Sequence, residues 1–246
     1  MIRTVLAYAF LGLAMFFLLP LLILWTLITK NADAEFFPSM RAIALSLRIA
    51  KIHVRVEGRE NIPPVACVFV SNHASNLDPL VLFPVVGRRI SVLIKKELMR
   101  IPILATGMRL ANFVAVDRAD RKAAAASLER CLCLLRDGLS FVIFAEGTRS
   151  PDGRLLPFKR GALLLAIQAG APIVPVAIGG THRLMRKGHW AIQPGEVTVR
   201  FGAPIDPSQF ATRRGGRDLL GTIESAVAAA LPPDQQPLSP SQVSPA

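Results

Sequence analysis

Cysteine, tyrosine and acidic residues are scarce in this sequence, and their scarcity excludes several classes of protein. The 246 residues include three cysteines (Cys67, Cys131 and Cys133), one tyrosine and 17 Asp+Glu. Three cysteines without a C-x-x-C pair suit neither a disulfide framework nor a zinc site, so we expect reduced, buried thiols. Aromatic residues make up 7% of the chain. That is too few for stacking platforms, and we expect no nucleic-acid partner.

Four familiar catalytic signatures are absent as well. The chain contains no G-x-S-x-G, no G-x-x-x-x-G-K-[ST], no G-x-G-x-x-G and no H-E-x-x-H. These patterns belong to serine hydrolases, nucleotide-binding proteins and zinc proteases, so those classes lose support. Nothing in the remaining pattern calls for a metal or another cofactor, and we expect none.

Hydrophobic and basic residues are abundant. Hydrophobic residues make up 52% of the chain, and the mean hydropathy is +0.43. A total of 29 Lys+Arg against 17 Asp+Glu gives a net charge of +12. So basic a chain is attracted to anions, either a phosphorylated substrate or an acidic membrane surface. Its length is enough to bury one α/β core.

Residues 1–51 are predicted to be a membrane-anchoring helical segment. No charged residue occurs between Val5 and Ile28, and this run would make about 36 Å of helix, enough to cross the hydrocarbon core. Pro20 lies inside the run and is a candidate for a kink or for a re-entrant turn. A signal peptide cleaved after 32–34 is the alternative, but the run is too long and Lys30 intervenes.

A second helix, predicted at 36–51, follows with Pro38 in its first turn. Arg41, Arg48 and Lys51 form a basic stripe on it, so it is either an interfacial helix or an ordinary packed one. Basic residues are more frequent after the apolar run than before it. The positive-inside rule therefore predicts a cell (inner) membrane protein with its catalytic domain on the cytoplasmic side, in contact with anionic membrane lipids.

From residue 52 onward, short apolar runs alternate with helical stretches. This pattern predicts an α/β domain over 52–231, a mixed, largely parallel sheet of about seven strands flanked by helices. The predicted strands are 52–56, 66–71, 90–94, 112–116, 140–144, 173–178 and 196–201. The predicted helices are 79–86, 101–110, 121–136, 161–169 and 217–231. The remaining residues, 232–246, are rich in proline, serine and glutamine and are predicted to be a disordered tail.

His73 is a candidate general base because it follows an apolar strand, where α/β sheets place their sites. Asp78 lies five residues further on, and a carboxylate beside a histidine fixes its tautomer and stabilises its charged form. The spacing requires a turn that leads into a helix. Asp78 and Pro79 also fit the N-cap and first position of that helix, so Asp78 as a plain cap and Ser75 as a turn residue are the structural alternatives.

A second polar cluster follows another apolar strand, at residues 144–150 (Phe-Ala-Glu-Gly-Thr-Arg-Ser). Arg149 offers a planar fork that binds phosphate, with hydroxyls and backbone N–H groups beside it. The structural alternative is an ion pair between Glu146 and Arg149 that staples the loop. More cations follow in the 153–161 stretch.

Together these blocks resemble the 1-acyl-sn-glycerol-3-phosphate acyltransferase (lysophosphatidate acyltransferase) family. The family's N-H-x-S-x-x-D block matches Asn72, His73, Ser75 and Asp78, and its F-P-E-G-T-R-S block matches Phe144 and 146–150. Further blocks match 112–118, 174–176 and the 95–98 stretch, so the resemblance spans roughly residues 50–205. Ala145 replaces the family's usual proline and is expected to loosen that turn.

The resemblance implies acyl transfer from a thioester, either acyl-CoA or acyl-carrier protein, to the sn-2 hydroxyl of lysophosphatidic acid, giving phosphatidic acid. His73 is then the general base and Asp78 orients it. A thioester is already activated, so no enzyme nucleophile is needed. The implied substrate-binding residues are Asn72, Ser75, Lys95, Arg118, Glu146, Gly147, Thr148 and Arg149, with Arg149 on the acceptor phosphate.

Two alternatives remain open at this stage. Lyso-ornithine lipid acyltransferases resemble the same family, and their acceptor lacks phosphate. A lipid-binding membrane protein with a degenerate site is the other alternative, against which the intact His73 and Asp78 pair argues.

Overall fold

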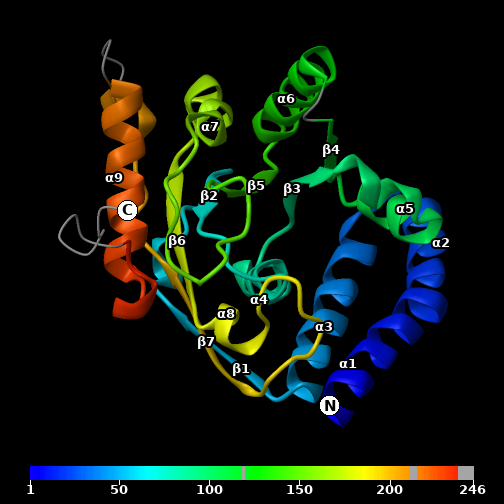
Figure 1. Cartoon of the computed structure of the whole chain (residues 1–246). Coiled ribbons are helices and arrows are strands. Elements are labelled where there is room, and N and C mark those ends of the chain that lie inside the picture. Colours follow the sequence, from blue (N-terminus) through cyan, green and yellow to red (C-terminus); the bar gives the residue numbers. More distant parts are fainter. Residues whose placement is uncertain (118–119, 211–214, 238–246) are drawn as a thin grey trace.

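A seven-stranded sheet forms the centre of the computed structural model, which describes residues 1–117, 120–210 and 215–237 (Figure 1). The strand order is β1-β7-β6-β2-β5-β3-β4. The strands are β1 (Ile52–Glu57), β2 (Val68–Ser71), β3 (Ile90–Lys95), β4 (Val114–Val116), β5 (Ser140–Phe144), β6 (Ile173–Gly179) and β7 (Gly195–Phe201). Each predicted strand is present, with ends that differ by at most two residues.

The sheet is largely parallel. All neighbouring pairs run parallel except β6 and β7, which are antiparallel. The strands β1 and β7 therefore run opposite to the other five. The predicted mixed sheet flanked by helices is confirmed.

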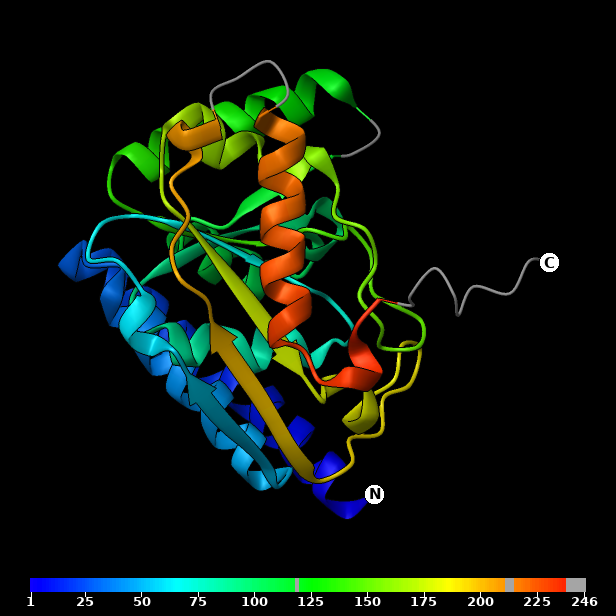
Figure 2. The ribbon, with the colours of Figure 1, turned by 90° about the vertical axis from the view of Figure 1, so that its left-hand side faces the viewer.

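Helices cover both faces of the sheet, as Figures 1 and 2 show. On one face lie α3 (Asp33–Ile49) and α4 (Leu77–Val86), and on the other α6 (Arg121–Arg136), α7 (Leu164–Ala169) and α9 (Gly215–Ala230). Along β2, Phe69 packs toward α3 and α4, whereas Val68 and Val70 pack toward α6, α7 and α9. Two covered faces explain why the strands read as continuous apolar runs.

The shorter elements connect these layers. They are α5 (Pro102–Leu110), α8 (Thr181–Leu184), and the 3₁₀ turns η2 (Arg59–Asn61), η3 (Lys96–Arg100), η4 (Arg160–Ala162), η5 (Pro207–Phe210) and η6 (Pro233–Gln235). Of the three cysteines, Cys67 and Cys131 are buried, but Cys133 is exposed on α6. The expectation of three buried thiols is therefore wrong for Cys133, because its position on α6 faces solvent.

The N-terminal residues form one long bent helix, Ile2–Thr29, that is long and apolar enough to cross a membrane. It consists of α1 (Ile2–Leu13), a π-helical turn η1 (Ala14–Leu18) and α2 (Leu19–Thr29). The π turn ends at Leu18, two residues before Pro20. Proline lacks the N–H that a regular turn needs, and π turns accommodate such breaks. The chain then reverses, and α3 returns alongside α1 and α2 (Figure 1). We call α1, η1, α2 and α3 the N-terminal hairpin.

The second N-terminal helix differs from its prediction. It begins at Asp33, so Pro38 lies inside it and not in its first turn. Asn31 Oδ1 accepts the Asp33 N–H, and acidic side chains at Asp33 and Glu35 favour the N-terminal end of a helix. α3 is also a packed helix, since Phe36 and Leu47 are buried against the core.

The C-terminal residues are more ordered than predicted. Residues 232–237 were assigned to a disordered tail, but Pro233–Gln235 forms η6 and the Gln235 side chain is completely buried. The prediction of disorder fails there because it rested on amino-acid composition, which does not show that Gln235 is buried and hydrogen-bonded. The rest of the predicted tail, 238–246, lies outside the described residues.

Candidate active site

Three neighbouring parallel strands, β6, β2 and β5, end at the same edge of the sheet. Each delivers a polar side chain two residues after its last residue: His73 after β2, Glu146 after β5 and Thr181 after β6. The carboxyl edge of a parallel sheet is where α/β proteins place their sites. The predicted contact between the His73 and Asp78 side chains is present at this edge.

His73 and Asp78 form a close pair, with 2.7 Å between His73 Nδ1 and Asp78 Oδ2. The same oxygen accepts the backbone N–H groups of Ala74 at 2.7 Å and Ser75 at 2.8 Å, and Asp78 Oδ1 accepts the Thr181 hydroxyl at 2.5 Å. Asp78 lies in the first turn of α4, and Asn76 is its N-cap, so the predicted capping role of Asp78 is wrong. Its side chain folds back over residues 73–75 instead.

This network assigns the tautomer of His73. A carboxylate that accepts hydrogen bonds on both oxygens is best matched by a ring N–H, so Nδ1 carries the proton. Nε2 then holds the lone pair that can take a proton. The ring stacks on Phe144 with centroids 4.3 Å apart, and its side chain is 20% exposed, so it is held in place but reachable.

The backbone of His73 is held from both sides. Its N–H donates to Glu146 Oε1 at 2.7 Å, and its carbonyl accepts the Ser150 N–H at 2.8 Å. Burial raises the pKa of the Glu146 carboxyl to about 8, although hydrogen bonds from the backbone of His73 and Leu156 lower it. Glu146 Oε2 has no hydrogen-bond partner among the described residues.

Glu146 was predicted to bind the acceptor, but its geometry favours another role. It is buried, and its carboxyl faces the backbone of the His73 loop. The alternative reading, an ion pair with Arg149, is wrong, because Arg149 Nη1 donates to Asn76 Oδ1 at 2.7 Å instead. Ala145 donates its N–H to the Ser71 carbonyl at 3.0 Å, a bond that a proline could not make. Ala145 therefore ties this turn to β2 and does not loosen it.

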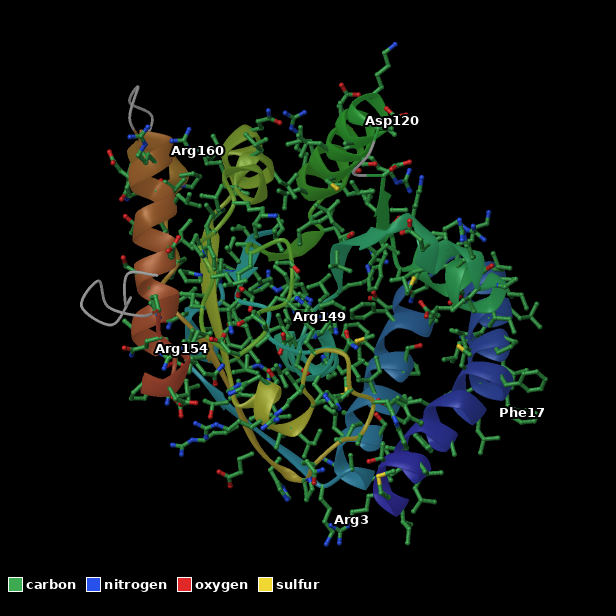
Figure 3. All side chains as sticks on the ribbon, viewed as in Figure 1. Arg3, Phe17, Asp120, Arg149, Arg154 and Arg160 are labelled. Atoms are coloured by element: carbon green, nitrogen blue, oxygen red, sulfur yellow. The ribbon has the colours of Figure 1, made fainter. Side chains whose placement is uncertain are left out.

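Thr148 and Arg149 lie at the open side of this edge. Thr148 is exposed and Arg149 half-buried, and Figure 3 shows Arg149 near the centre of the molecule. Gly147 before them has a φ of +70°, and a Cβ there would lie 3.0 Å from Lys159 Cδ. Glycine therefore allows both the turn and the approach of a second cation.

Asn72 and Ser75, also predicted to bind substrate, are fully engaged by the protein. Asn72 exchanges two hydrogen bonds with the Ile178 backbone, Nδ2 to O at 3.0 Å and N to Oδ1 at 2.8 Å. Ser75 Oγ donates to the Met185 carbonyl at 2.7 Å and accepts the Leu77 N–H. Both side chains are buried, so they shape the loop and do not face an acceptor.

Two further residues, Lys95 and Arg118, were predicted to bind substrate. Lys95 ends β3, but its side chain is not described, and Arg118 lies outside the described residues. The neighbouring Lys96 pairs with Asp117. Within residues 1–117, 120–210 and 215–237, no three His, Cys, Asp or Glu side chains are grouped to hold a metal ion.

Thr181 is the residue that the sequence analysis missed. It is buried, and its hydroxyl reaches Asp78 across 103 positions of sequence. The available signal was the Gly179-Gly180-Thr181 sequence directly after an apolar strand.

Comparison with known proteins places the chain in a family. An acyltransferase family model matches residues 53–179. A 1-acyl-sn-glycerol-3-phosphate acyltransferase of Limnanthes douglasii is 34% identical over 195 residues, which cover 79% of this chain and 69% of the plant protein. A protein of the same name from Pseudomonas aeruginosa is 33% identical over 191 residues, 76% of this chain and 71% of its own length.

The fold agrees with the sequence matches. The crystal structure of the 1-acyl-sn-glycerophosphate acyltransferase PlsC from Thermotoga maritima is similar with a TM-score of 0.81 and 29% identity, covering 93% of both chains. On sequence and on fold alike, this chain belongs to the acyltransferase family, among the 1-acyl-sn-glycerol-3-phosphate acyltransferases.

Proposed function

We propose that this enzyme transfers an acyl chain from acyl-CoA or acyl-carrier protein to the sn-2 hydroxyl of 1-acylglycerol 3-phosphate, with His73 as general base. The observation that carries the proposal is the His73 and Asp78 pair, whose geometry leaves Nε2 as the proton acceptor. The loop with the exposed Thr148 and the half-buried Arg149 bonds to the His73 backbone through the Ser150 N–H. The names of the relatives supply the acceptor and the reaction class.

The chemistry follows from the tautomer of His73. As the acceptor oxygen attacks the thioester carbonyl, His73 Nε2 removes the hydroxyl proton and becomes an imidazolium. Asp78, which keeps its negative charge, stabilises that imidazolium. The tetrahedral intermediate collapses with cleavage of the carbon–sulfur bond, and the thiolate that leaves takes the proton back from His73.

The acceptor phosphate binds to Arg149 in this proposal, with the Thr148 hydroxyl and the ammonium of Lys159 close by. A planar guanidinium forms two parallel hydrogen bonds with a phosphate. The proposal also assigns added positive potential to Lys95 and Arg118. Glu146, Asn72 and Ser75 hold the loops that carry these groups.

We also propose that the N-terminal hairpin attaches the enzyme to the cytoplasmic face of the cell membrane. Large apolar side chains on α1 and α2 are exposed, and Figure 3 shows Phe17 pointing away from the protein. Arg41 and Arg48 are exposed on α3, where they suit anionic lipid headgroups. Residues 1–51 then act as the anchor and 52–231 as the catalytic domain.

A direct assay tests the proposed function. Purified enzyme in detergent is incubated with labelled acyl-CoA or acyl-carrier protein and a panel of lyso-lipids with and without phosphate. We expect the fastest acylation with 1-acylglycerol 3-phosphate, and we expect His73→Ala to lower kcat about 10²- to 10⁴-fold. His53→Ala, a change at an exposed histidine on β1, is the control. Faster turnover of a lyso-ornithine lipid, or substantial activity in His73→Ala, would overturn the proposal.

A further inference from the structure

We propose that Thr181 is a positioning residue for the His73 and Asp78 pair, and that the C-terminal residues 232–236 hold it in place. We call residues 232–236 the C-terminal strap. The inference rests on the proposed general-base role of His73. Thr181 and the strap both lie beyond residues 53–179, the part of the chain that the family model matches.

Thr181 completes the hydrogen bonding of Asp78. Oδ2 of Asp78 is occupied by His73 and by two backbone N–H groups, whereas Oδ1 accepts the Thr181 hydroxyl. Both side chains are buried. Without the hydroxyl, Oδ1 loses a donor in a place that water does not readily reach, and a buried carboxylate without donors is poorly stabilised as an anion. The carboxylate is then held through Oδ2 alone, and its orientation toward His73 is less firmly fixed.

The strap fixes the position of Thr181 through its neighbour Gly180. Gln235 Oε1 accepts the Gly180 N–H at 2.6 Å, and Gln235 Nε2 donates to the Gly153 carbonyl at 3.3 Å. The Leu155 N–H donates to the Gln235 carbonyl at 2.8 Å. One buried glutamine thereby joins the loop after β6 to the loop after β5.

Further contacts of the strap reinforce this link. Asp234 pairs with Arg183 in α8, and the Arg154 guanidinium donates to the Gln236 carbonyl at 3.2 Å. Pro232 packs so closely on Gly179 that a Cβ there would lie 2.9 Å from its ring. Figure 2 shows η6 beside α8 and the loop after β5. The strap thus touches both loops that flank His73.

Variants of Thr181 test the first part. We expect Thr181→Val to lower kcat about 10- to 150-fold with little change in KM, the range for losing a hydrogen bond to a charged group. Thr181→Ser, which keeps the hydroxyl, should recover most of kcat. In an Asp78→Asn background the same Thr181→Val change should cost less than about 3-fold, because a residue that acts through Asp78 has little left to position. An equal loss in both backgrounds, or wild-type kcat in Thr181→Val, overturns the role.

The strap is tested with two neighbouring glutamines. Gln235→Ala should lower kcat. Gln236→Ala is the matched control, because it keeps the backbone carbonyl that accepts Arg154 and removes only a side-chain hydrogen bond to the Leu231 carbonyl. Melting temperatures of all variants identify any that fail to fold. If Gln235→Ala folds and keeps wild-type kcat, the strap has no positioning role. The two proposals fail in different ways. Activity in His73→Ala contradicts the general-base role of His73. An inactive His73→Ala together with a fully active Thr181→Val contradicts only the positioning role of Thr181.

Discussion

Substitution of Arg149 tests whether this residue binds the acceptor phosphate or only stabilises its loop. A charge-assisted hydrogen bond to phosphate is worth roughly 1.5–3 kcal/mol. We therefore expect Arg149→Ala to lower kcat/KM about 10- to 150-fold for 1-acylglycerol 3-phosphate and much less for a phosphate-free lyso-lipid. Arg149→Lys should recover only part, because lysine offers a point charge and no fork.

The control for charge alone is Arg160→Ala, since Figure 3 shows Arg160 well away from Arg149. Arg160 is exposed, so its removal should leave kcat/KM nearly unchanged. Equal losses for both lyso-lipids in Arg149→Ala, together with a lower melting temperature, would show that Arg149 only stabilises its loop through Asn76.

Glu146 should make the stability of the protein depend on pH. Its pKa is raised from 4.5 to about 8 by burial, so the folded state keeps a proton that the unfolded state releases. The free energy of unfolding then falls as pH rises from about 4.5 to about 8. Glu146→Gln, which carries no proton to lose, should flatten this fall in urea unfolding.

Glu35 contributes to the same trend, because burial raises its pKa to about 7. The decisive quantity is therefore the difference between Glu146→Gln and the wild type across that pH range. Parallel curves for the two proteins would show that Glu146 is ionised in the folded state.

Single residues show where sequence reasoning works and where it stops. His73 and Asp78 are close in sequence and follow a strand, so their pairing could be predicted. Thr181 carries no such pattern, because its partner is 103 positions away. The sequence places a carboxyl group at residue 146, but it does not show that this carboxyl accepts the His73 N–H and does not face the acceptor. That direction depends on how the loop after β5 folds.

At the scale of elements, α1 is attached to the loop before β7 as well as to α3. The Thr4 hydroxyl donates to the Ile192 carbonyl and accepts the Ile192 N–H, both at 3.1 Å, in a buried position. Tyr8 donates to the Trp190 carbonyl at 3.0 Å. The same loop holds Ser75 through Met185, so α1 also supports the His73 loop.

We expect Thr4→Val to destabilise the enzyme by about 1–3 kcal/mol, because both Ile192 backbone groups lose their partner in a buried place. Activity in detergent should fall with it. The control is Thr29→Val, since that exposed hydroxyl bonds only to nearby backbone groups, the Trp25 carbonyl and the Asn31 N–H, among the described contacts. Equal stability of the two variants, measured by thermal unfolding, would contradict a supporting role for α1.

Elements were predictable where one physical constraint dominates. Strands buried on both faces produce apolar runs that give nearly correct ends. The start of α3 was misplaced because Pro38 is tolerated inside this helix. The order of residues 232–237 depends on Gln235 reaching loops far away in sequence, which composition does not show.

For the whole molecule, membrane attachment should depend on the exposed apolar face of the N-terminal hairpin. Phe16 and Phe17 are 64% and 62% exposed and touch little of the core. Burying a phenylalanine in an apolar phase contributes roughly 1.5–3 kcal/mol. The double variant Phe16→Ser/Phe17→Ser should therefore bind lipid vesicles at least about 100-fold more weakly in a sedimentation assay.

The matched control for that experiment is Leu164→Ser, a change at an exposed apolar residue on α7, on the other side of the molecule (Figure 1). Its vesicle binding should equal that of the wild type. A similar loss in both variants would mean that attachment follows general surface hydrophobicity and not the hairpin.

Helix α1 and the C-terminal strap both bond to the segment between β6 and β7, Thr4 at Ile192 and Gln235 at Gly180. A protein is synthesised from its N-terminus, and contacts between distant residues form late. The loop that carries Thr181 therefore cannot reach its final form until residue 235 has been made. The N-terminal hairpin precedes Gln235 by most of the chain. On the two proposals above, a growing chain can therefore bind lipid before its active site is complete.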